Sequence, residues 1–185
     1  MKKVQDEHLV ILIKGFDERV NKLEGEITAE TVTDFVHTYH HPLIAEFDPE
    51  TGFKAPMNLL LLTSAESDTF VEIMNVAKEV AKEFRSDIVR FVYVNVDDEK
   101  NRRILKFLEV REEDLPTFCL TTFKGHLLKY KPDNSEFSHH NIQSFINNCK
   151  SGDVKPHLNS QDLPEDWNEF VGKHKHEVLK TKEEL

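Results

Sequence analysis

The chain has 185 residues, enough for one complete domain and part of a second. Its 24 basic and 34 acidic residues give a formal net charge of −10, which argues against binding to nucleic acid or to an anionic membrane, because both would repel the chain. With two cysteines, Cys119 and Cys149, the sequence has no disulfide scaffold, no four-thiolate zinc site and no Cys-x-x-Cys redox pair.

The first 41 residues predict a fragment of a domain. A short β-branched run over 9–14, a polar stretch and a second run over 23–27 predict two strands joined by a turn. Thr28 is expected to cap a helix whose apolar residues recur at helical spacing and which ends before Pro42. Because two strands and one helix cannot enclose a core, this part is expected to need a partner or to stay loose.

The following residues predict an α/β domain with a mixed central sheet flanked by helices. Strands are expected at 43–47, 57–62, 88–96, 117–121 and 126–130, with helices beginning near Ser67, Asn101 and Ser138. The alternation of strands and helices calls for parallel strands with right-handed crossovers, and the closing hairpin adds an antiparallel edge. This order is that of a thioredoxin-like fold, in which the proline before the fourth strand, Pro116, is expected to be cis.

Several motifs carry a closer resemblance. The chain resembles the protein disulfide isomerase family, from the end of the b domain through the b′ domain and into the following linker. The matching segments include residues 42–47, 103–108, 115–116, 129–132, 151–158 and 163–167. The resemblance implies three parts: a remnant of a b domain over 1–41, a b′-like domain over 42–152, and a linker and tail over 153–185.

In that family the b′ domain lacks redox activity and binds unfolded or misfolded polypeptides through an apolar pocket. Carried over by position, the substrate-binding residues would be Phe47, Phe53, Ile104, Phe107, Leu108 and Phe123. The family places a full helix between the first two strands, whereas this chain has only residues 48–56, so the pocket would lose part of one wall. The alternative for the helix positions is the core, although the neighbours Phe107 and Leu108 cannot both face the sheet.

The sequence predicts no enzyme, no catalytic residue, no cofactor and no metal ligand set. Isomerase chemistry needs a low-pKa thiolate and a nearby resolving thiol, whereas Cys119 and Cys149 are expected to be buried small hydrophobes. One alternative is a fragment or isoform of a disulfide isomerase whose activity resides in catalytic domains absent from this chain.

The histidines and acidic runs leave a second alternative open. The ten histidines show no metal-ligand spacing, and surface positions are expected for them. The runs 97–99 and 112–114 are expected to be solvated caps of helix ends, with weak calcium binding in an acidic lumenal protein as the alternative.

The tail, Lys182-Glu183-Glu184-Leu185, differs by one acidic residue from the Lys-Asp-Glu-Leu retention signal. With the resemblance, it predicts the lumen of the endoplasmic reticulum and binding to a retention receptor, although the chain carries no signal peptide. The other expected partners are unfolded polypeptides and catalytic disulfide isomerases. Nucleic acid and membrane insertion are not expected, because no apolar run approaches the length of a membrane span.

Overall fold

The computed structural model describes residues 9–48, 55–85, 89–123 and 127–157. The chain divides into two compact units, residues 1–43 (unit 1) and residues 44–185 (unit 2). Among the described residues, no helix has both the length and the apolar character that crossing a membrane requires.

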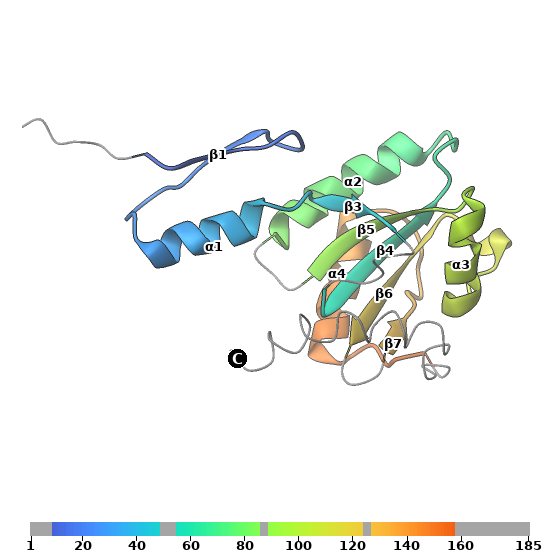
Figure 1. The fold of residues 1–185 in the computed structure, drawn as a ribbon. Coiled ribbons are helices and arrows are strands. Elements are labelled where there is room, and N and C mark those ends of the chain that lie inside the picture. The colour runs from blue at the N-terminus through green and yellow to red at the C-terminus, as the bar shows by residue number, and fades with distance from the viewer. Residues whose placement is uncertain (1–8, 49–54, 86–88, 124–126, 158–185) are drawn as a thin grey trace, which may run out of the picture. The chain divides into compact units, whose positions relative to one another are not determined.

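Unit 1 consists of a hairpin and one helix. Strands β1 (Ile11–Ile13) and β2 (Val20–Lys22) pair antiparallel, and α1 (Ala29–Tyr39) follows (Figure 1). The predicted cap is confirmed, because the Thr28 side chain accepts a hydrogen bond from the backbone N–H of Thr31 at 3.1 Å.

The prediction of a second strand over 23–27 was wrong. The polar stretch between the two runs predicted a turn that extends to Leu23, but the chain reverses direction before that. Asp17 and Arg19 form the turn in left-handed backbone conformations with φ of 48° and 58°. Pairing therefore starts at Val20 and ends at Lys22. Side chains of the hairpin remain in contact with solvent, and Leu9 and Ile13 are 61% and 78% exposed. Within the described residues, unit 1 thus leaves much of its apolar surface uncovered.

Unit 2 contains a five-stranded mixed sheet in the order β3-β5-β4-β6-β7. The inner strand β5 pairs in parallel with both β3 and β4, while β6 runs antiparallel to β4 and β7 antiparallel to β6. The predicted parallel sheet with an antiparallel closing hairpin is confirmed. The bounds are β3 Ile44–Glu46, β4 Met57–Thr63, β5 Val89–Asn95, β6 Thr117–Phe123 and β7 Leu127–Tyr130.

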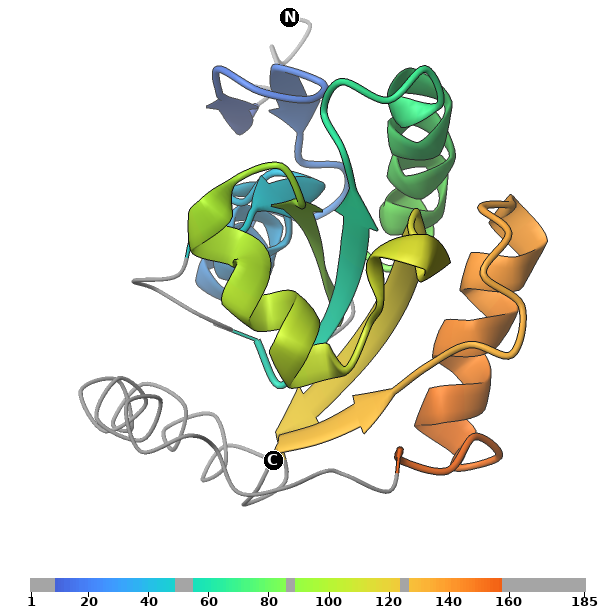
Figure 2. The same ribbon diagram turned by 90° about the vertical axis from the view of Figure 1, so that its right-hand side faces the viewer.

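Helices cover both faces of this sheet. Helices α2 (Phe70–Glu83) and α4 (His139–Ser151) lie on one face, and α3 (Arg102–Leu108) lies on the other (Figure 2). Two short 3₁₀ helices, η1 (Glu99–Asn101) and η2 (Glu112–Asp114), flank α3. All seven residues of β4 are buried, as expected for a strand covered on both faces.

The end of α2 is tied to the start of α4. The Glu83 carboxylate accepts a hydrogen bond from Gln143 Nε2 at 2.6 Å and lies 2.7 Å from His139 Nε2. The pair of helices therefore forms one layer, and α3 alone covers the opposite face among the described residues.

Candidate functional site

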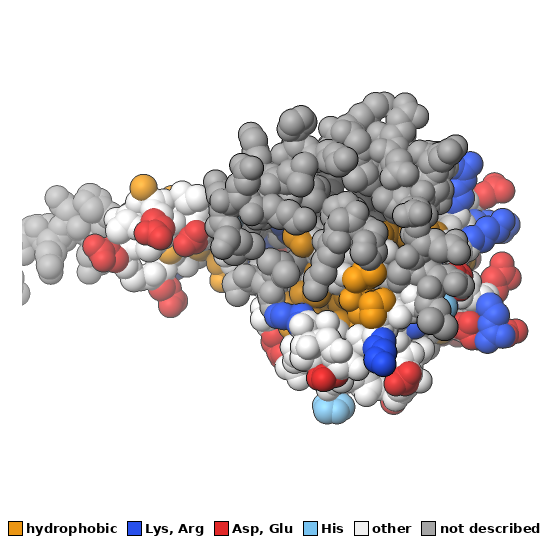
Figure 3. All heavy atoms as spheres, turned by 90° about the horizontal axis from the view of Figure 1, so that it is seen from below, with side chains coloured by type: hydrophobic (Ala, Val, Ile, Leu, Met, Phe, Trp, Pro, Cys, Tyr) orange, Lys and Arg blue, Asp and Glu red, His pale blue; other side chains and the backbone are white. Residues whose placement is uncertain are grey.

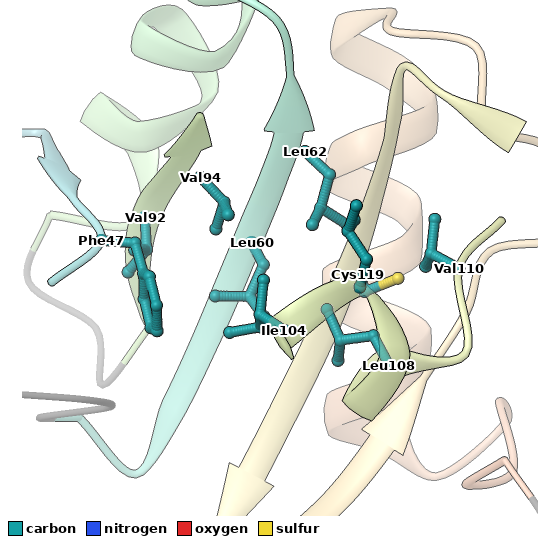
Figure 4. Close-up of a cluster of buried hydrophobic side chains, with 10 residues drawn as sticks. Phe47, Leu60, Leu62, Val92, Val94, Ile104, Leu108, Val110 and Cys119 are labelled. Atoms are coloured by element: carbon teal, nitrogen blue, oxygen red, sulfur yellow. The ribbon is translucent and has the colours of Figure 1, made fainter. Parts of the chain in front are cut away.

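The face of the sheet under α3 carries one compact hydrophobic cluster, named the α3 cluster. Alternate residues of β4 and β5 point towards α3, because successive side chains of a strand face opposite sides of a sheet. The cluster consists of Phe47, Leu60, Leu62, Val92, Val94, Ile104, Leu105, Leu108, Val110 and Cys119 (Figure 4). The cluster packs α3 against β4, β5, β6 and the residue that follows β3. It therefore determines which side chains of α3 face inwards and which face outwards.

Three of the six predicted substrate-binding residues lie inside this cluster. Phe47, Ile104 and Leu108 are 7%, 2% and 1% exposed. Phe107 is half-buried and packs against the outside of the cluster. In this conformation, Phe107 is therefore the member of the described set that a polypeptide could contact.

The other two predicted residues cannot be placed in the same way. Phe53 lies outside the described residues, and Phe123 belongs to β6 but its side chain is not described. The structure thus brings four of the six positions together in and around the α3 cluster.

Phe107 lies against a charged group that the sequence analysis did not single out. The Lys129 ammonium donates a hydrogen bond to the Phe107 carbonyl oxygen at 2.9 Å and lies 4.9 Å from the centre of the Phe107 ring. Lys129 is only 5% exposed, and its ammonium lies 3.7 Å from the Glu109 carboxylate. The Lys129 carbonyl in turn accepts a hydrogen bond from the backbone N–H of His157 at 2.7 Å. Phe107 therefore sits where α3, β7 and the segment after α4 meet.

The sequence contained only a weak signal for this arrangement. In the hairpin of β6 and β7, Lys129 lies opposite Thr121, and the side chains of two opposite residues point to the same face of a sheet. Thr121 faces the interior, so Lys129 does too, but the register that makes them a pair becomes visible only in the folded sheet.

Both cysteines are free, and both are buried, the burial having been predicted. Cys119 belongs to the α3 cluster, whereas Cys149 lies on α4, on the other face of the sheet. Burial raises the pKa of each thiol from 9.0 to about 12, and for Cys119 the nearby Lys131 ammonium opposes that rise. A thiol with so high a pKa is a poor nucleophile at neutral pH.

A proline loop lies at the edge of the sheet where β4 ends. The Leu115-Pro116 peptide bond is cis, as expected, and Leu62 pairs with Thr117, which places Pro116 beside the end of β4. The loop that follows β4 begins with Ser64, whose hydroxyl donates to the Asp97 carboxylate at 2.5 Å. Residues 64–69 contain no cysteine. Before the start of α2, where a helix N-terminus would lower the pKa of a thiol, the chain carries three hydroxyl groups and two carboxylates instead.

The acidic runs form caps and ion pairs. Asp98 accepts a hydrogen bond from the backbone N–H of Lys100 at 3.0 Å at the start of η1. Asp114 accepts two hydrogen bonds from the Arg111 guanidinium, each of 3.0 Å. Over the described ranges, no three His, Cys, Asp or Glu side chains come together in a way that could hold a metal ion.

A family model described as a thioredoxin-like domain matches residues 2–148. The chain belongs to this family. The crystal structure of the bb fragment of ERp72 superimposes with a TM-score of 0.51 at 18% identity, covering 77% of this chain and 65% of that one. The zinc-bound form of human ERp44 gives a TM-score of 0.53 at 15% identity, covering 76% of this chain and 39% of that one. At these identities the two structures show a shared fold.

Curated relatives confirm the resemblance that the motifs indicated. The chain is 34% identical to a protein disulfide-isomerase of Drosophila melanogaster over 163 residues, which are 85% of this chain and 33% of that protein. It is 33% identical to a protein disulfide-isomerase of Gallus gallus over 179 residues, which are 91% of this chain and 35% of that protein. The chain spans about a third of the length of these relatives.

Proposed function

We propose that unit 2 is a redox-inactive, b′-like module that binds unfolded or misfolded polypeptides through an apolar surface around Phe107. The observation that carries the proposal is Phe107 itself, an aromatic side chain that stays half-buried on top of a fully packed cluster. An aromatic side chain at such a position offers a large apolar contact area to a ligand. Partly buried Val96 and Leu115 extend the apolar rim of the same cluster.

An apolar surface around Phe107 favours binding with little sequence specificity. Seen from below, the described part of the chain carries a group of hydrophobic side chains, with charged side chains of both signs towards one edge (Figure 3). Binding at such a surface depends on apolar contact more than on directed hydrogen bonds, so it is weak and tolerant of sequence. This is the behaviour expected of a module that holds many different unfolded chains.

The absence of redox activity is supported by the position and the protonation of the thiols. Disulfide exchange proceeds through a thiolate, and burial keeps the protons on both Cys119 and Cys149 at neutral pH. The disulfide isomerase activity of the longer relatives would then require further domains joined to this module or acting beside it. Catalytic disulfide isomerases are therefore proposed as partners, together with the unfolded chains.

Unit 1 is proposed to be the closing part of a second thioredoxin-like domain. Its order, β1-β2-α1, repeats the order β6-β7-α4 that closes unit 2. The exposed apolar residues of its hairpin fit a strand pair that normally packs against further elements. The tail over 182–185, outside the described residues, is proposed to address the protein to the lumen of the endoplasmic reticulum through a retention receptor.

The test is binding of a fluorescently labelled, permanently unfolded polypeptide, followed by anisotropy. Phe107→Ala should weaken binding about tenfold, because losing a central aromatic contact costs at least ~1.4 kcal/mol. Phe70→Ala is the matched control, since Phe70 is also a half-buried phenylalanine but packs on Tyr93 on the α2 side of the sheet. Equal binding by wild type and Phe107→Ala would show that the assigned surface is wrong.

A further inference from the structure

A second feature of the α3 side of unit 2 is a cavity that does not include Phe107. Its volume is about 250 Å³, and it lies between the segment that leads into β6 and the segment that follows β7. Val110 and Pro132 provide apolar wall, and the Cys119 thiol also lines it. The sulfur atom of Cys119 points towards Val110 (Figure 4). The cavity is smaller than the ~300–1,000 Å³ of a typical small-molecule site, so it suits a group about as large as one side chain.

The polar lining of this cavity has unused hydrogen-bond donors. The Lys131 ammonium donates to the Glu109 carbonyl oxygen at 2.7 Å, and its other two hydrogens have no acceptor among the described residues. Thr117 donates its hydroxyl hydrogen to Ser135 Oγ at 3.1 Å, which leaves the Ser135 hydroxyl hydrogen without an acceptor in the same part of the structure. Two side chains therefore present free donors to one small space.

The carboxylate in the lining is paired with a guanidinium. Each oxygen of Asp114 accepts a hydrogen bond from Arg111, and this contact, together with the nearby charge of Lys131, holds the pKa of Asp114 below its ordinary value. The charge of Asp114 is thus offset by a bidentate guanidinium contact. Lys131 and Arg111 together carry one more positive charge than Asp114 neutralises, and among the described residues the remaining hydrogens of Lys131 and Ser135 make no hydrogen bond, so the lining favours a ligand that brings a charged acceptor.

We propose that this cavity binds a carboxylate on a short aliphatic stem. The carboxylate would accept hydrogen bonds from Lys131 and Ser135, and the stem would lie against Val110 and Pro132. Two sources share this chemistry: the acidic side chain of a polypeptide and a free small carboxylate. The site shares Val110 and Cys119 with the α3 cluster but does not include Phe107, so it does not depend on the polypeptide binding proposed for the surface around Phe107.

The test is a titration of the isotope-labelled full chain, followed through the backbone amide signals of Thr117, Lys131 and Ser135. N-acetyl-glutamate amide should shift these signals in a saturable way, and N-acetyl-glutamine amide should bind at least tenfold more weakly. Propionate and a blocked Ala-Glu-Ala peptide separate the two sources. Tighter binding of the peptide identifies an acidic side chain, and equal or tighter binding of propionate identifies a free carboxylate.

Variants test the assigned donors. Lys131→Gln should weaken the binding of N-acetyl-glutamate amide at least tenfold, and Ser135→Ala should weaken it several-fold while leaving the rest of the spectrum unchanged. Lys78→Gln is the control, because Lys78 is an exposed lysine on α2, and no residue of α2 lines the cavity. Equal binding of the glutamate and glutamine compounds, or unchanged binding in both Lys131→Gln and Ser135→Ala, would overturn the proposal.

Discussion

Lys129 donates a hydrogen bond to the carbonyl oxygen of Phe107 at 2.9 Å, and the same ammonium lies 4.9 Å from the centre of the Phe107 ring. One buried charge therefore satisfies a carbonyl near the end of α3 and contacts the aromatic face beside it. Strand β7 and helix α3 are joined at the residue that is proposed to bind polypeptide.

The first prediction concerns this contact. Lys129→Met keeps an unbranched apolar stem but leaves the Phe107 carbonyl oxygen without that donor, so the free energy of unfolding should fall by about 1–3 kcal/mol. Lys106→Met on the exposed side of α3 is the matched control and should change the free energy of unfolding by less than ~0.5 kcal/mol. Urea denaturation measures both. Equal stability of Lys129→Met and wild type would show that the contact does not hold β7 to α3.

The second prediction separates the core from the binding surface in two adjacent residues. Leu108 is 1% exposed, so Leu108→Ala should lower the free energy of unfolding by about 2–5 kcal/mol through the cavity it creates. Phe107→Ala should lower it by only about 1–2 kcal/mol, because the side chain is only partly buried. Urea denaturation again provides the measurement. A larger loss in Phe107→Ala than in Leu108→Ala would place Phe107 in the core.

Phe107 and Leu108 show how much of the candidate site could be predicted from the sequence. The spacing alone established that Phe107 and Leu108 cannot both face the sheet, and the structure places Leu108 inside and Phe107 at the surface. Lys129 could not be predicted as their neighbour, because a lysine in a strand is expected to face solvent and the contact spans 22 positions of sequence. The element order of unit 2 was predictable because its strands and helices alternate with strong periodicity.

The turn of the first hairpin shows the opposite case. The reversal of the chain depends on left-handed conformations of Asp17 and Arg19, and an arginine in a sequence does not predict such a conformation. The second strand consequently begins at Val20 rather than at Leu23. The cavity beside Lys131 escaped the sequence analysis for a related reason, since it is formed by segments that only the register of β6 and β7 brings together.

The third prediction concerns pH. In the folded chain, burial keeps the protons on Cys119 and Cys149 up to about pH 12, whereas the unfolded chain releases them near the ordinary value of 9.0. Between these values the unfolded state binds fewer protons, so stability is complete below about pH 9 and falls as the pH rises towards 12. Each thiol contributes a slope of up to about 1.4 kcal/mol per pH unit.

The measurement is urea denaturation at pH 8, 9.5 and 11 under reducing conditions. Cys119→Ala/Cys149→Ala should show a smaller loss of stability between pH 9.5 and 11 than wild type, whatever its stability at pH 8. Ellman's reagent at pH 8 gives an independent readout, because the folded chain should leave both thiols unmodified and the unfolded chain should not. Rapid modification of the folded chain would contradict the assigned burial and the absence of redox activity together.

The fourth prediction uses two helix starts that differ in their caps. At α4, the Ser138 side chain accepts a hydrogen bond from the backbone N–H of Asn141 at 3.3 Å. Ser138→Ala should therefore lower the free energy of unfolding by about 1 kcal/mol, because an N–H of the first turn loses its acceptor. At α2, Thr69 precedes the helix but its side chain makes no capping hydrogen bond, so Thr69→Ala should change the free energy of unfolding by less than half as much.

Thermal and urea denaturation of the two variants make the comparison. Since α4 packs with α2 through Glu83, equal effects would mean that the start of α4 is held by that contact rather than by its cap.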